Sequence, residues 1–361
     1  MTTPTAGIIG LGFGRAHIPA FQARGCQVIG LCQRDEAAAR AVAKAYGVPQ
    51  VYARWEDLLA RARPDIVVIA TPTHLHRTIA LAAFEAGAHV LCEKPLAMNR
   101  AEAEAMVEAA GRAGRVAMTN FNWRFPAAMR DLHARVAAGA LGRVFHVALR
   151  WLGGRFADEG VAPTWRTDRA LAGHGAMGDM GVHLVDLVRW QFGEWRRVVA
   201  QAGIAHPARP APGDARPPGA EDYCTVLGEL DAGVQVTLTV SRAARGASEH
   251  TLEAYGSGGA ASYRLGRDGA RWWEGELSVC ERGAGFVRVE PPAPAPEGAG
   301  RGDPLDVVGR TTIAPLVGEL LEAIRTGRPA APSFEDGLRA QLVLDAVLAS
   351  LARGGWVDVA R

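Results

Sequence analysis

The stretch GIIGLGFG, residues 7–14, decides the fold. Three glycines follow a short apolar run at the point where a strand turns into a helix, and glycines there permit a tight turn. They also let backbone N–H groups come close to a phosphate group at the start of the helix. The spacing departs from G-x-G-x-x-G, because Arg15 occupies the third glycine position and Gly14 lies one residue early. Taken alone, the stretch is also compatible with an ordinary tight turn.

Beyond this turn, short apolar segments alternate with alanine-rich segments of helical length up to about residue 120. Strands that are apolar at consecutive positions are typical of a parallel sheet covered by helices on both faces. The alternation therefore predicts a doubly wound α/β domain over residues 1–124. The predicted strands are 7–10, 28–32, 66–70, 90–92 and 116–119, and the predicted helices are 36–46, 77–86 and 101–113.

The second half of the chain has a different texture. Longer strands are predicted at 144–151, 223–230 and 234–240, and the last two flank a hairpin turn at Asp231-Ala232-Gly233. Residues 125–361 are therefore expected to form an α+β domain with a large, open, mostly antiparallel sheet. Helices are expected at 315–326 and 337–353, and the proline-rich stretches 207–218 and 291–296 are expected to be surface loops.

Composition excludes several classes of protein. Lys and Arg total 40 against 38 Asp and Glu, without a basic stripe, so a nucleic-acid partner is not expected. The five cysteines are scattered, which argues against a disulfide framework or zinc site and for buried thiols. The start of the chain lacks the features of a signal peptide, and no apolar run reaches the roughly 18 to 20 residues that span a bilayer. A cytoplasmic protein is expected.

Dinucleotide binding is predicted at the glycine turn and at the end of the second strand. The residues of the turn are Gly10, Gly12, Phe13, Gly14 and Arg15. About 20 residues on, where NAD-binding proteins place an acidic side chain on the ribose, stands Gln33, followed by Arg34. An arginine can pair with a 2′-phosphate that Gln33 does not repel, so NADP is favoured over NAD. In the alternative, Asp35 reaches the ribose and Arg34 stacks on the adenine, which retains NAD.

Polar residues follow the third and fourth strands. Thr71, Pro72, His74 and His76 come after one, and Glu93-Lys94-Pro95 comes after the other. Ligands bind at the carboxyl ends of the strands in open α/β sheets, so Lys94 is placed to reach a substrate. An isolated Lys-Pro pair, by contrast, is more often a solvated lysine before a turn.

A glycine-rich loop leads into a helix between Gly173 and Asp186. Asp179 and His183 are four residues apart, hence on one helix face, which Asp186 and Trp190 continue. A carboxylate beside an imidazole favours the charged ring and orients it, which suits acid–base work near neutral pH. A surface pair or a capped core histidine is the plainer interpretation. No third ligand stands at informative spacing, so no metal is expected.

These residues together resemble the glucose-fructose oxidoreductase, inositol dehydrogenase and MocA (Gfo/Idh/MocA) family over nearly the whole chain. The resemblance is carried by three blocks in the family's order, residues 71–76 with 86–96, 175–186 and 332–337. It implies a Rossmann domain, and a C-terminal open sheet that serves dimer or tetramer contacts. It also implies NAD(P)-dependent oxidation of a secondary alcohol on a sugar, inositol or related polyol.

Carried over by position, the resemblance also implies roles for single residues. Lys94 would bind the reacting hydroxyl, His183 would act as general acid/base, and Asp179 would bind substrate and tune His183. Glu93 and Pro95 would set the place of the lysine, through a cis Lys-Pro bond. Further residues at the cofactor would be Thr71, Pro72, His74, His76, Asn122, Arg124, Trp165 and Arg166.

Two other functions remain open at this point. The same site, with a tightly held cofactor, could assist glycoside cleavage or internal redox exchange by transient oxidation. A non-enzymatic, dinucleotide-dependent sensor or co-repressor is the other, although the joint presence of Lys94, Asp179 and His183 argues against it. The sequence does not name a sugar, because loops of the second domain complete the pocket.

Overall fold

The computed structural model describes residues 3–209, 219–266, 272–290, 300 and 302–361. The proline-rich stretch 291–296 and most of 207–218, both expected to be surface loops, lie outside the described residues. The chain divides into two compact units, residues 1–122 with 297–338 and residues 123–296 with 339–361.

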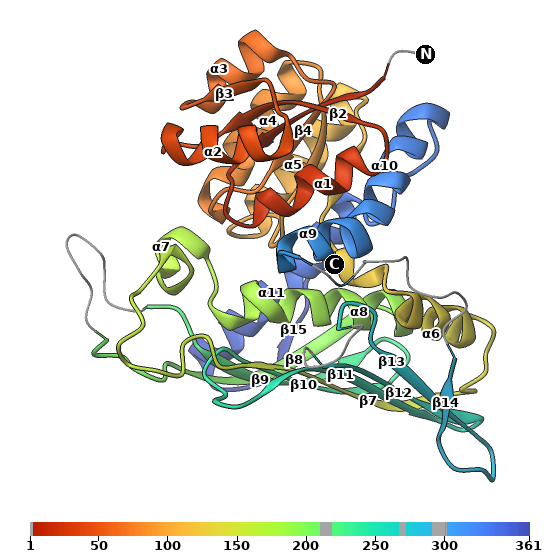
Figure 1. Ribbon diagram of the computed structural model, residues 1–361. Helices are drawn as coiled ribbons and strands as arrows, with labels where there is room; N and C mark the ends of the chain where they lie inside the picture. The colour runs from red at the N-terminus through yellow and green to blue at the C-terminus, as the bar shows by residue number, and fades with distance from the viewer. Residues whose placement is uncertain (1–2, 210–218, 267–271, 291–299, 301) are drawn as a thin grey trace. The chain divides into compact units, whose positions relative to one another are not determined.

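The first unit is built on a six-stranded parallel sheet with the strand order β3-β2-β1-β4-β5-β6 (Figure 1). This is the doubly wound arrangement that the sequence predicts. Its strands are β1 (Thr5–Ile9), β2 (Gln27–Cys32), β3 (Gln50–Tyr52), β4 (Ile66–Ile69), β5 (His89–Cys92) and β6 (Ala117–Thr119). Its helices up to residue 122 include α1 (His17–Gln22), α2 (Glu36–Tyr46), α3 (Trp55–Asp57), α4 (His76–Glu85) and α5 (Arg100–Ala113).

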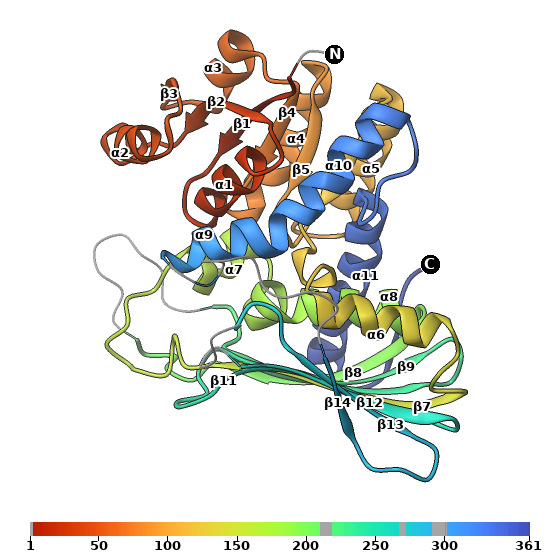
Figure 2. The same cartoon turned by 45° about the vertical axis from the view of Figure 1, so that its right-hand side comes forward.

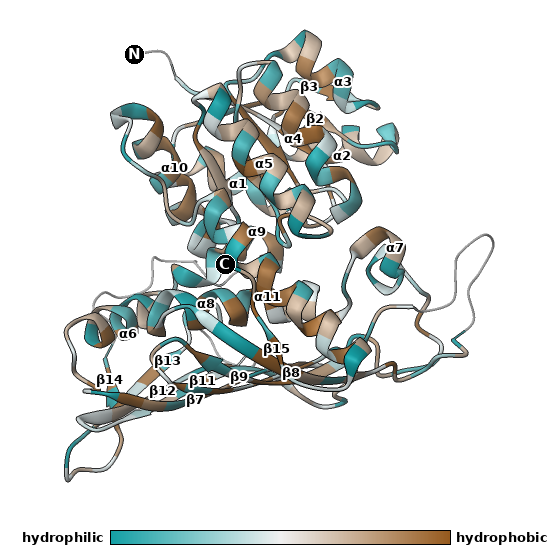
Figure 3. Ribbon diagram, turned by 180° about the vertical axis from the view of Figure 1, so that it is seen from behind, coloured by the Kyte–Doolittle hydropathy of each residue, from teal (hydrophilic) through white to brown (hydrophobic). Residues whose placement is uncertain are grey.

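Burial explains why these segments form strands and helices. All four residues of β4 are buried, as expected for a central strand covered on both faces. The helices are amphipathic, and Figure 3 shows both hydrophilic and hydrophobic residues along α2 and α5. Asn99 caps the start of α5 by accepting a hydrogen bond from the N–H of Glu102, and Gly114 ends it in the left-handed conformation.

The strand order reverses beside β1, and this reversal places the candidate ligand site of the unit. β2 pairs with one side of β1 and β4 with the other. The loops that follow β1 and β4 therefore start on opposite sides of one crevice at the carboxyl edge of the sheet. In open α/β sheets this is the place where ligands bind.

Residues 297–338 belong to the first unit, whereas the sequence predicts that all residues after 124 form the second domain. The segment contains α9 (Pro304–Val308), the π-helical turn η7 (Gly309–Ile313) and α10 (Ala314–Thr326). It packs on the α1 side of the sheet: a Cβ on Gly309 would lie 2.2 Å from the Ala16 carbonyl oxygen, and Tyr46 donates a hydrogen bond to Asp306. Ser333 forms an antiparallel bridge with Met118 of β6. The block 332–337 therefore supports the first sheet.

The second unit is built on a nine-stranded sheet with the order β14-β13-β12-β11-β7-β10-β9-β8-β15. Among the described strands of this sheet only β7 and β10 pair in parallel, so the sheet is mostly antiparallel, and β9 and β10 form the predicted hairpin. Its strands are β7 (Val144–Gly153), β8 (Trp195–Gly203), β9 (Tyr223–Leu230), β10 (Gln235–Ser241), β11 (Ser248–Gly256), β12 (Gly259–Gly266), β13 (Glu276–Glu281), β14 (Val287–Val289) and β15 (Val357–Asp358). Its helices include α6 (Ala127–Ala137), α7 (Arg169–Ala172) and α8 (Val182–Phe192), while α11 (Phe334–Arg353) begins in the first unit.

Helices cover one face of this second sheet, where α6 and α8 lie side by side (Figure 2). Along β9, buried and exposed residues alternate, as expected for a strand with one covered face. The other face carries large apolar side chains, because Tyr223 is 46% and Leu227 is 41% exposed. None of the helices in the described ranges combines the length and the apolar character that crossing a membrane requires.

Candidate functional site

The three glycines after β1 have three different roles. Gly10 has φ +92°, and a Cβ there would lie 2.5 Å from the carbonyl oxygen of Ala70. Gly12 is exposed, and a Cβ on it would have no neighbour within 4 Å, so the space in front of it is open. Gly14 packs against the end of β4, since its Cβ would lie 2.8 Å from the Cβ of Ala70. Close helix–strand packing is the role of the third glycine in this type of loop, and here Gly14 takes it one residue early.

Arg15, at the usual third glycine position, is anchored within the first unit. Its guanidinium lies 2.6 Å from the carboxylate of Asp303, which also caps α9 by accepting from the N–H of Leu305. The neighbouring Phe13 ring meets His17 edge-on, with the ring centroids 6.3 Å apart. A role of Phe13 and Arg15 at the pyrophosphate stays a prediction.

Residues 33–35 after β2 differ in what they bind. The side-chain oxygen of Gln33 accepts a hydrogen bond from the Leu11 N–H at 3.2 Å, so it supports the glycine loop. The Asp35 carboxylate caps α2 by accepting from the Ala38 N–H at 3.0 Å. Arg34 is exposed, and within the part of the chain that the structure describes its guanidinium makes no hydrogen bond or ion pair. Arg34 is thus the side chain of the three that is available to a ligand.

The loop after β4 contains two buried hydroxyl groups near the same edge of the sheet. The buried hydroxyls of Thr71 and Thr73 have no hydrogen-bond partner among the described residues. Buried polar groups are nearly always paired, so such atoms point to a ligand or to ordered water. Together with the open space at Gly12, these hydroxyls fit a dinucleotide lying across the ends of β1 and β4.

His76 joins the loops that follow β4 and β5. Its Nε2 lies 3.0 Å from the carbonyl oxygen of Thr71, and its Nδ1 lies 3.0 Å from that of Pro95 and 3.2 Å from that of Leu96. The ring is fully buried, and burial lowers its pKa more than the carbonyl contacts raise it. His76 therefore holds the two loops together, and its predicted contact with the cofactor stays a prediction. The Lys94–Pro95 bond is cis, as predicted.

Lys94 follows β5 and is half-buried beside a buried polar network. The Glu93 carboxylate contacts the imidazole Nε2 of His17 at 2.7 Å and accepts a hydrogen bond from the Asn120 amide at 2.7 Å. Burial alone would raise the pKa of Glu93. The hydrogen bond and charge of His17, the charge of Lys94 and the Asn120 amide outweigh it, so the pKa lies below its ordinary value. An ionised Glu93 thus stands directly before the lysine.

Lysine is otherwise almost absent from the chain. Of its 40 basic residues only Lys44 and Lys94 are lysines. A lysine carries a compact charge with three donors on a flexible stem, whereas an arginine carries a planar fork. Position 94 is therefore one of only two positions in the chain whose side chain can approach a single oxygen atom as a compact point charge.

His17→Leu is expected to destabilise the protein by about 3 kcal/mol at neutral pH, because the Glu93 carboxylate loses a buried partner. In the wild type the pKa of Glu93 is depressed, so its contribution to stability is present above the unfolded pKa of about 4.3 and is lost as pH falls through the lower folded pKa. The difference between the two proteins should therefore shrink in acid. Denaturant unfolding at several pH values measures it.

Glu93→Gln provides the control background. There His17→Leu should cost much less, because no buried charge remains to be matched. An equal cost in the wild-type and Glu93→Gln backgrounds would contradict the coupling of His17 to this carboxylate.

Asn122 and Arg124 lie on either side of the boundary between the units, and both are held by protein groups. The Asn122 amide donates to the hydroxyl of Thr312 at 2.8 Å. The Arg124 guanidinium makes two hydrogen bonds to the carboxylate of Asp186, at 2.8 and 2.5 Å, and this pair is buried. Arg124 also lies over the ring of Trp190. The proposed cofactor contacts of Asn122 and Arg124 stay predictions, and Asp186 and Trp190 pack inside the second unit.

In the second unit, Glu221 holds the glycine-rich loop in place. Its carboxylate accepts hydrogen bonds from the N–H groups of Gly175 at 2.8 Å and Met177 at 3.1 Å. Gly175 has no room for a side chain, because a Cβ would lie 2.0 Å from the Glu221 carbonyl oxygen. The loop then enters a π-helical turn, η6 (Met177–Gly181), which continues as α8. Such turns are frequent at functional sites.

Asp179 lies in this π-helical turn, between two guanidinium groups. The Nε of Arg166 is 3.5 Å from one carboxylate oxygen, and Nη1 of Arg242 is 4.0 Å from the other. The Arg166 guanidinium also stacks on the Trp165 ring, 4.3 Å from its centroid. Arg166, which the resemblance assigns to the cofactor together with Trp165, therefore contacts Asp179, the residue predicted to bind the substrate.

His183 lies on α8 against an aromatic wall. Its ring centroid is 5.6 Å from that of Trp151 on β7. Trp151 in turn stacks on His250 at 4.9 Å and meets Trp123 edge-on at 5.5 Å. The imidazole is buried, so this packing limits the orientations that it can adopt.

Sequence reasoning missed His17, Asn120, Trp151, Glu221 and Arg242. None belongs to a short motif, because each meets its partner through tertiary packing.

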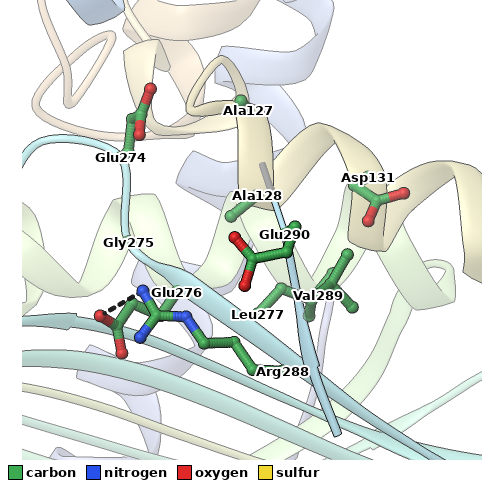
Figure 4. A pocket seen from close by; sticks show the side chains of 10 residues that line it. All are labelled: Ala127, Ala128, Asp131, Glu274, Gly275, Glu276, Leu277, Arg288, Val289 and Glu290. Carbon is green, nitrogen blue, oxygen red and sulfur yellow. Dashed lines mark ion pairs between the residues drawn. The ribbon is translucent and has the colours of Figure 1, made fainter. Parts of the chain in front are cut away.

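A hollow between α6 and the β13–β14 hairpin, with about 340 Å³ of space that includes open solvent, contains none of the candidate residues (Figure 4). It is partly acidic, and its Arg288 pairs with Glu276 at 2.9 Å. Over the described ranges, no cluster of His, Cys, Asp and Glu is suited to a metal ion.

Comparison with known proteins agrees with this geometry. Residues 5–121 match the model of the oxidoreductase family with an NAD-binding Rossmann fold, and residues 129–262 match the GFO/IDH/MocA C-terminal domain. Levoglucosan dehydrogenase of Pseudarthrobacter phenanthrenivorans is 31% identical over 99% of each chain. D-apiose dehydrogenase of Paraburkholderia graminis is 31% identical over 73% of this chain and 70% of its own. A solved levoglucosan dehydrogenase in complex with NADH and levoglucosan has a TM-score of 0.89 at 29% identity, with both chains fully covered.

The doubly wound fold of the first unit and the family models that match the two parts of the chain identify an NAD(P)-dependent oxidoreductase. The chain belongs to the Gfo/Idh/MocA family.

Proposed function

We propose that the protein transfers a hydride between a nicotinamide cofactor and a secondary alcohol of a sugar, inositol or related polyol. The observation that carries the proposal is the half-buried Lys94 at the carboxyl end of β5, next to the ionised Glu93 and the crevice at the strand reversal. The names of the relatives support the substrate class, since levoglucosan dehydrogenase and D-apiose dehydrogenase are sugar dehydrogenases.

In the proposed mechanism the cofactor, when bound, accepts or donates the hydride. Lys94 holds the reacting oxygen and stabilises negative charge that develops on it. His183 takes the hydroxyl proton in oxidation and returns it in reduction. Asp179 binds the substrate and favours the charged imidazole of His183.

A substrate panel tests this function. Purified protein is mixed with inositols, aldoses, anhydrosugars and uronates, or with their keto forms, and absorbance of the reduced nicotinamide is followed with NAD and NADP. Turnover of at least one sugar or polyol is expected. Binding of the dinucleotide without turnover of any of them would favour a sensor, and redox exchange without net cofactor reduction would favour the internal-redox alternative.

We infer that the cofactor is NADP. Gln33 is uncharged and therefore does not repel a 2′-phosphate, and its side-chain oxygen is engaged by the glycine loop. The Asp35 carboxylate is engaged as the cap of α2. The exposed Arg34 is available to pair with that group. The NADH found in the levoglucosan dehydrogenase complex is a property of that relative.

Arg34→Gln is expected to raise the Kd for NADP by roughly 10-fold or more, which corresponds to the loss of one charge-assisted hydrogen bond. The Kd for NAD should stay the same. Arg40→Gln is the matched control, because Arg40 lies on α2 and pairs with Glu36. Equal losses for both cofactors would instead support stacking of Arg34 on the adenine, and no loss would exclude Arg34 from the site.

We also propose that the protein forms a homodimer or homotetramer through the uncovered face of the second sheet. The half-exposed Tyr223 and Leu227 on that face support it, since large exposed apolar side chains often mark interfaces. Sedimentation velocity measures the state, and a monomer at micromolar concentration would contradict the proposal.

A further inference from the structure

Arg242 is a charged side chain in the interior of the second unit. It follows directly after β10, and its side chain is only 2% exposed. Its guanidinium donates to the carbonyl oxygens of Arg166 at 3.1 Å and Glu221 at 3.0 Å, and to the Asp222 carboxylate at 3.2 Å. Removing an arginine from water is costly unless its partners are well placed. Its place in the fold is therefore set by those partners.

These partners belong to the segments that build the surroundings of Asp179. The chain at Arg166 carries the other guanidinium that faces Asp179, and Glu221 clamps the loop from which the π-helical turn starts. The Arg242 side chain thus links three segments, namely its own segment after β10, the chain at Arg166 and the chain at Glu221. Its Nη1 lies 4.0 Å from the Asp179 carboxylate.

The positive charge of Arg166 acts less strongly on the Asp179 carboxylate than that of Arg242 does. Its side chain is 24% exposed, so solvent screens its charge, and its planar group is engaged on the Trp165 ring. Arg242 is the deeper of the two cations, and a buried charge is screened much less. Other charged groups of the second unit near this cluster include Asp222, Glu221 and Arg169, which pairs with Glu221 at 3.3 Å. Arg209 and Arg155 lie over the same Phe156 ring as Arg242, and Arg209 is also buried.

We propose that Arg242 is a positioning residue of the reaction, which keeps Asp179 ionised and oriented and thereby acts on His183. This inference rests on the proposed function, because it gives Asp179 and His183 the roles described there. Arg242 contacts the carboxylates of Asp179 and Asp222 and the carbonyl groups of Arg166 and Glu221. Of these groups, Asp179 is the one that the proposed function places on the substrate, so the influence of Arg242 passes through it.

The test compares three variants. Arg242→Met keeps the length of the side chain and removes its charge, whereas Arg242→Lys keeps the charge. Arg245→Met is the matched control, because Arg245 lies three residues away, is 70% exposed and pairs with Asp158 on the surface. Loss of a nearby positive charge raises the pKa values of both a carboxylate and an imidazole. The acid limb of kcat/KM against pH is therefore expected to move to higher pH in Arg242→Met. It should keep its wild-type position in Arg242→Lys and Arg245→Met.

A profile of Arg242→Met that superimposes on the wild-type profile after scaling would overturn the proposal, since a purely structural role changes amplitude alone. Should Arg242→Met fail to fold, Arg242→Lys combined with Asp179→Asn decides. The lysine keeps the charge but loses the planar fork that orients its partners, so Arg242→Lys is expected to lower kcat/KM without moving the acid limb. If Arg242 acts through Asp179, the reduction caused by Arg242→Lys should largely disappear in the Asp179→Asn background. An equal reduction in both backgrounds would contradict it.

A second readout does not depend on turnover, and so separates failure of this inference from failure of the proposed function. The carboxyl carbon of Asp179 is titrated by NMR in protein labelled with carbon-13 aspartate, with the signal assigned from Asp179→Asn. The pKa of Asp179 is expected to be higher in Arg242→Met than in Arg245→Met. An unchanged pKa would overturn the proposal even in a protein with no detectable activity.

Discussion

Lys94→Met is expected to lower kcat at least about 10³-fold, while the Kd for the dinucleotide changes little. Methionine has a similar length but no charge, so the reacting oxygen loses the cation that stabilises it in the transition state. Lys94→Arg should not restore activity, because the planar guanidinium cannot replace a compact ammonium at a single oxygen atom. Stopped-flow and steady-state assays with the best substrate of the panel measure the change.

The control for this prediction is Lys44→Met, since Lys44 is the other lysine of the chain and lies exposed near the end of α2. With only two lysines, reductive methylation followed by mass spectrometry compares them directly. Bound cofactor and sugar together should protect Lys94 and leave Lys44 reactive. Wild-type turnover in Lys94→Met, or no protection of Lys94, would remove this lysine from the site.

His183→Asn is expected to lower kcat by about 10² to 10⁴-fold, the usual range for loss of a general acid/base. The ring should be needed for its proton transfer and not for folding, because Asn fits the space beside Trp151 without adding bulk. Added imidazole should restore part of the activity in the variant. The pH dependence of kcat/KM should lose the limb that belongs to the histidine.

His146→Asn is the matched control for this variant, because His146 stacks on Tyr255, 4.9 Å away, from β7. It should retain wild-type kinetics. If His183→Asn raised KM and left kcat unchanged, His183 would bind substrate without moving its proton.

Periodicity along the chain was sufficient to predict the class of both sheets, although β3 and six strands of the second sheet, β8 and β11 to β15, were not predicted individually. The consecutive apolar residues of β4 and the alternation along β9 each depend on a strand's own neighbours, which the sequence shows directly. The glycine loop was also predictable. The structure adds that Gly14 carries out helix packing one residue early, which leaves position 15 free for an arginine that pairs with Asp303.

Partners that lie far apart in the sequence were not predictable from local patterns. The folded sheets bring His17 to Glu93 and Arg242 to Asp179, although the partners of each pair lie far apart in the sequence. Residues 297–338 return to the first unit for the same reason. The ion pair of Arg124 with Asp186 gives one usable signal: a carboxylate on the apolar face of a helix indicates a buried cationic partner.

The most direct test of the central claim uses reduced cofactor that carries deuterium at the transferable position. It is incubated with keto sugars in the presence of wild type, Lys94→Met and His183→Asn, and the products are analysed by mass spectrometry. The wild type is expected to place one deuterium on the carbinol carbon of a sugar or polyol, and both variants should do so far more slowly. Absence of deuterium in every product, or equal transfer by all three proteins, would contradict the account.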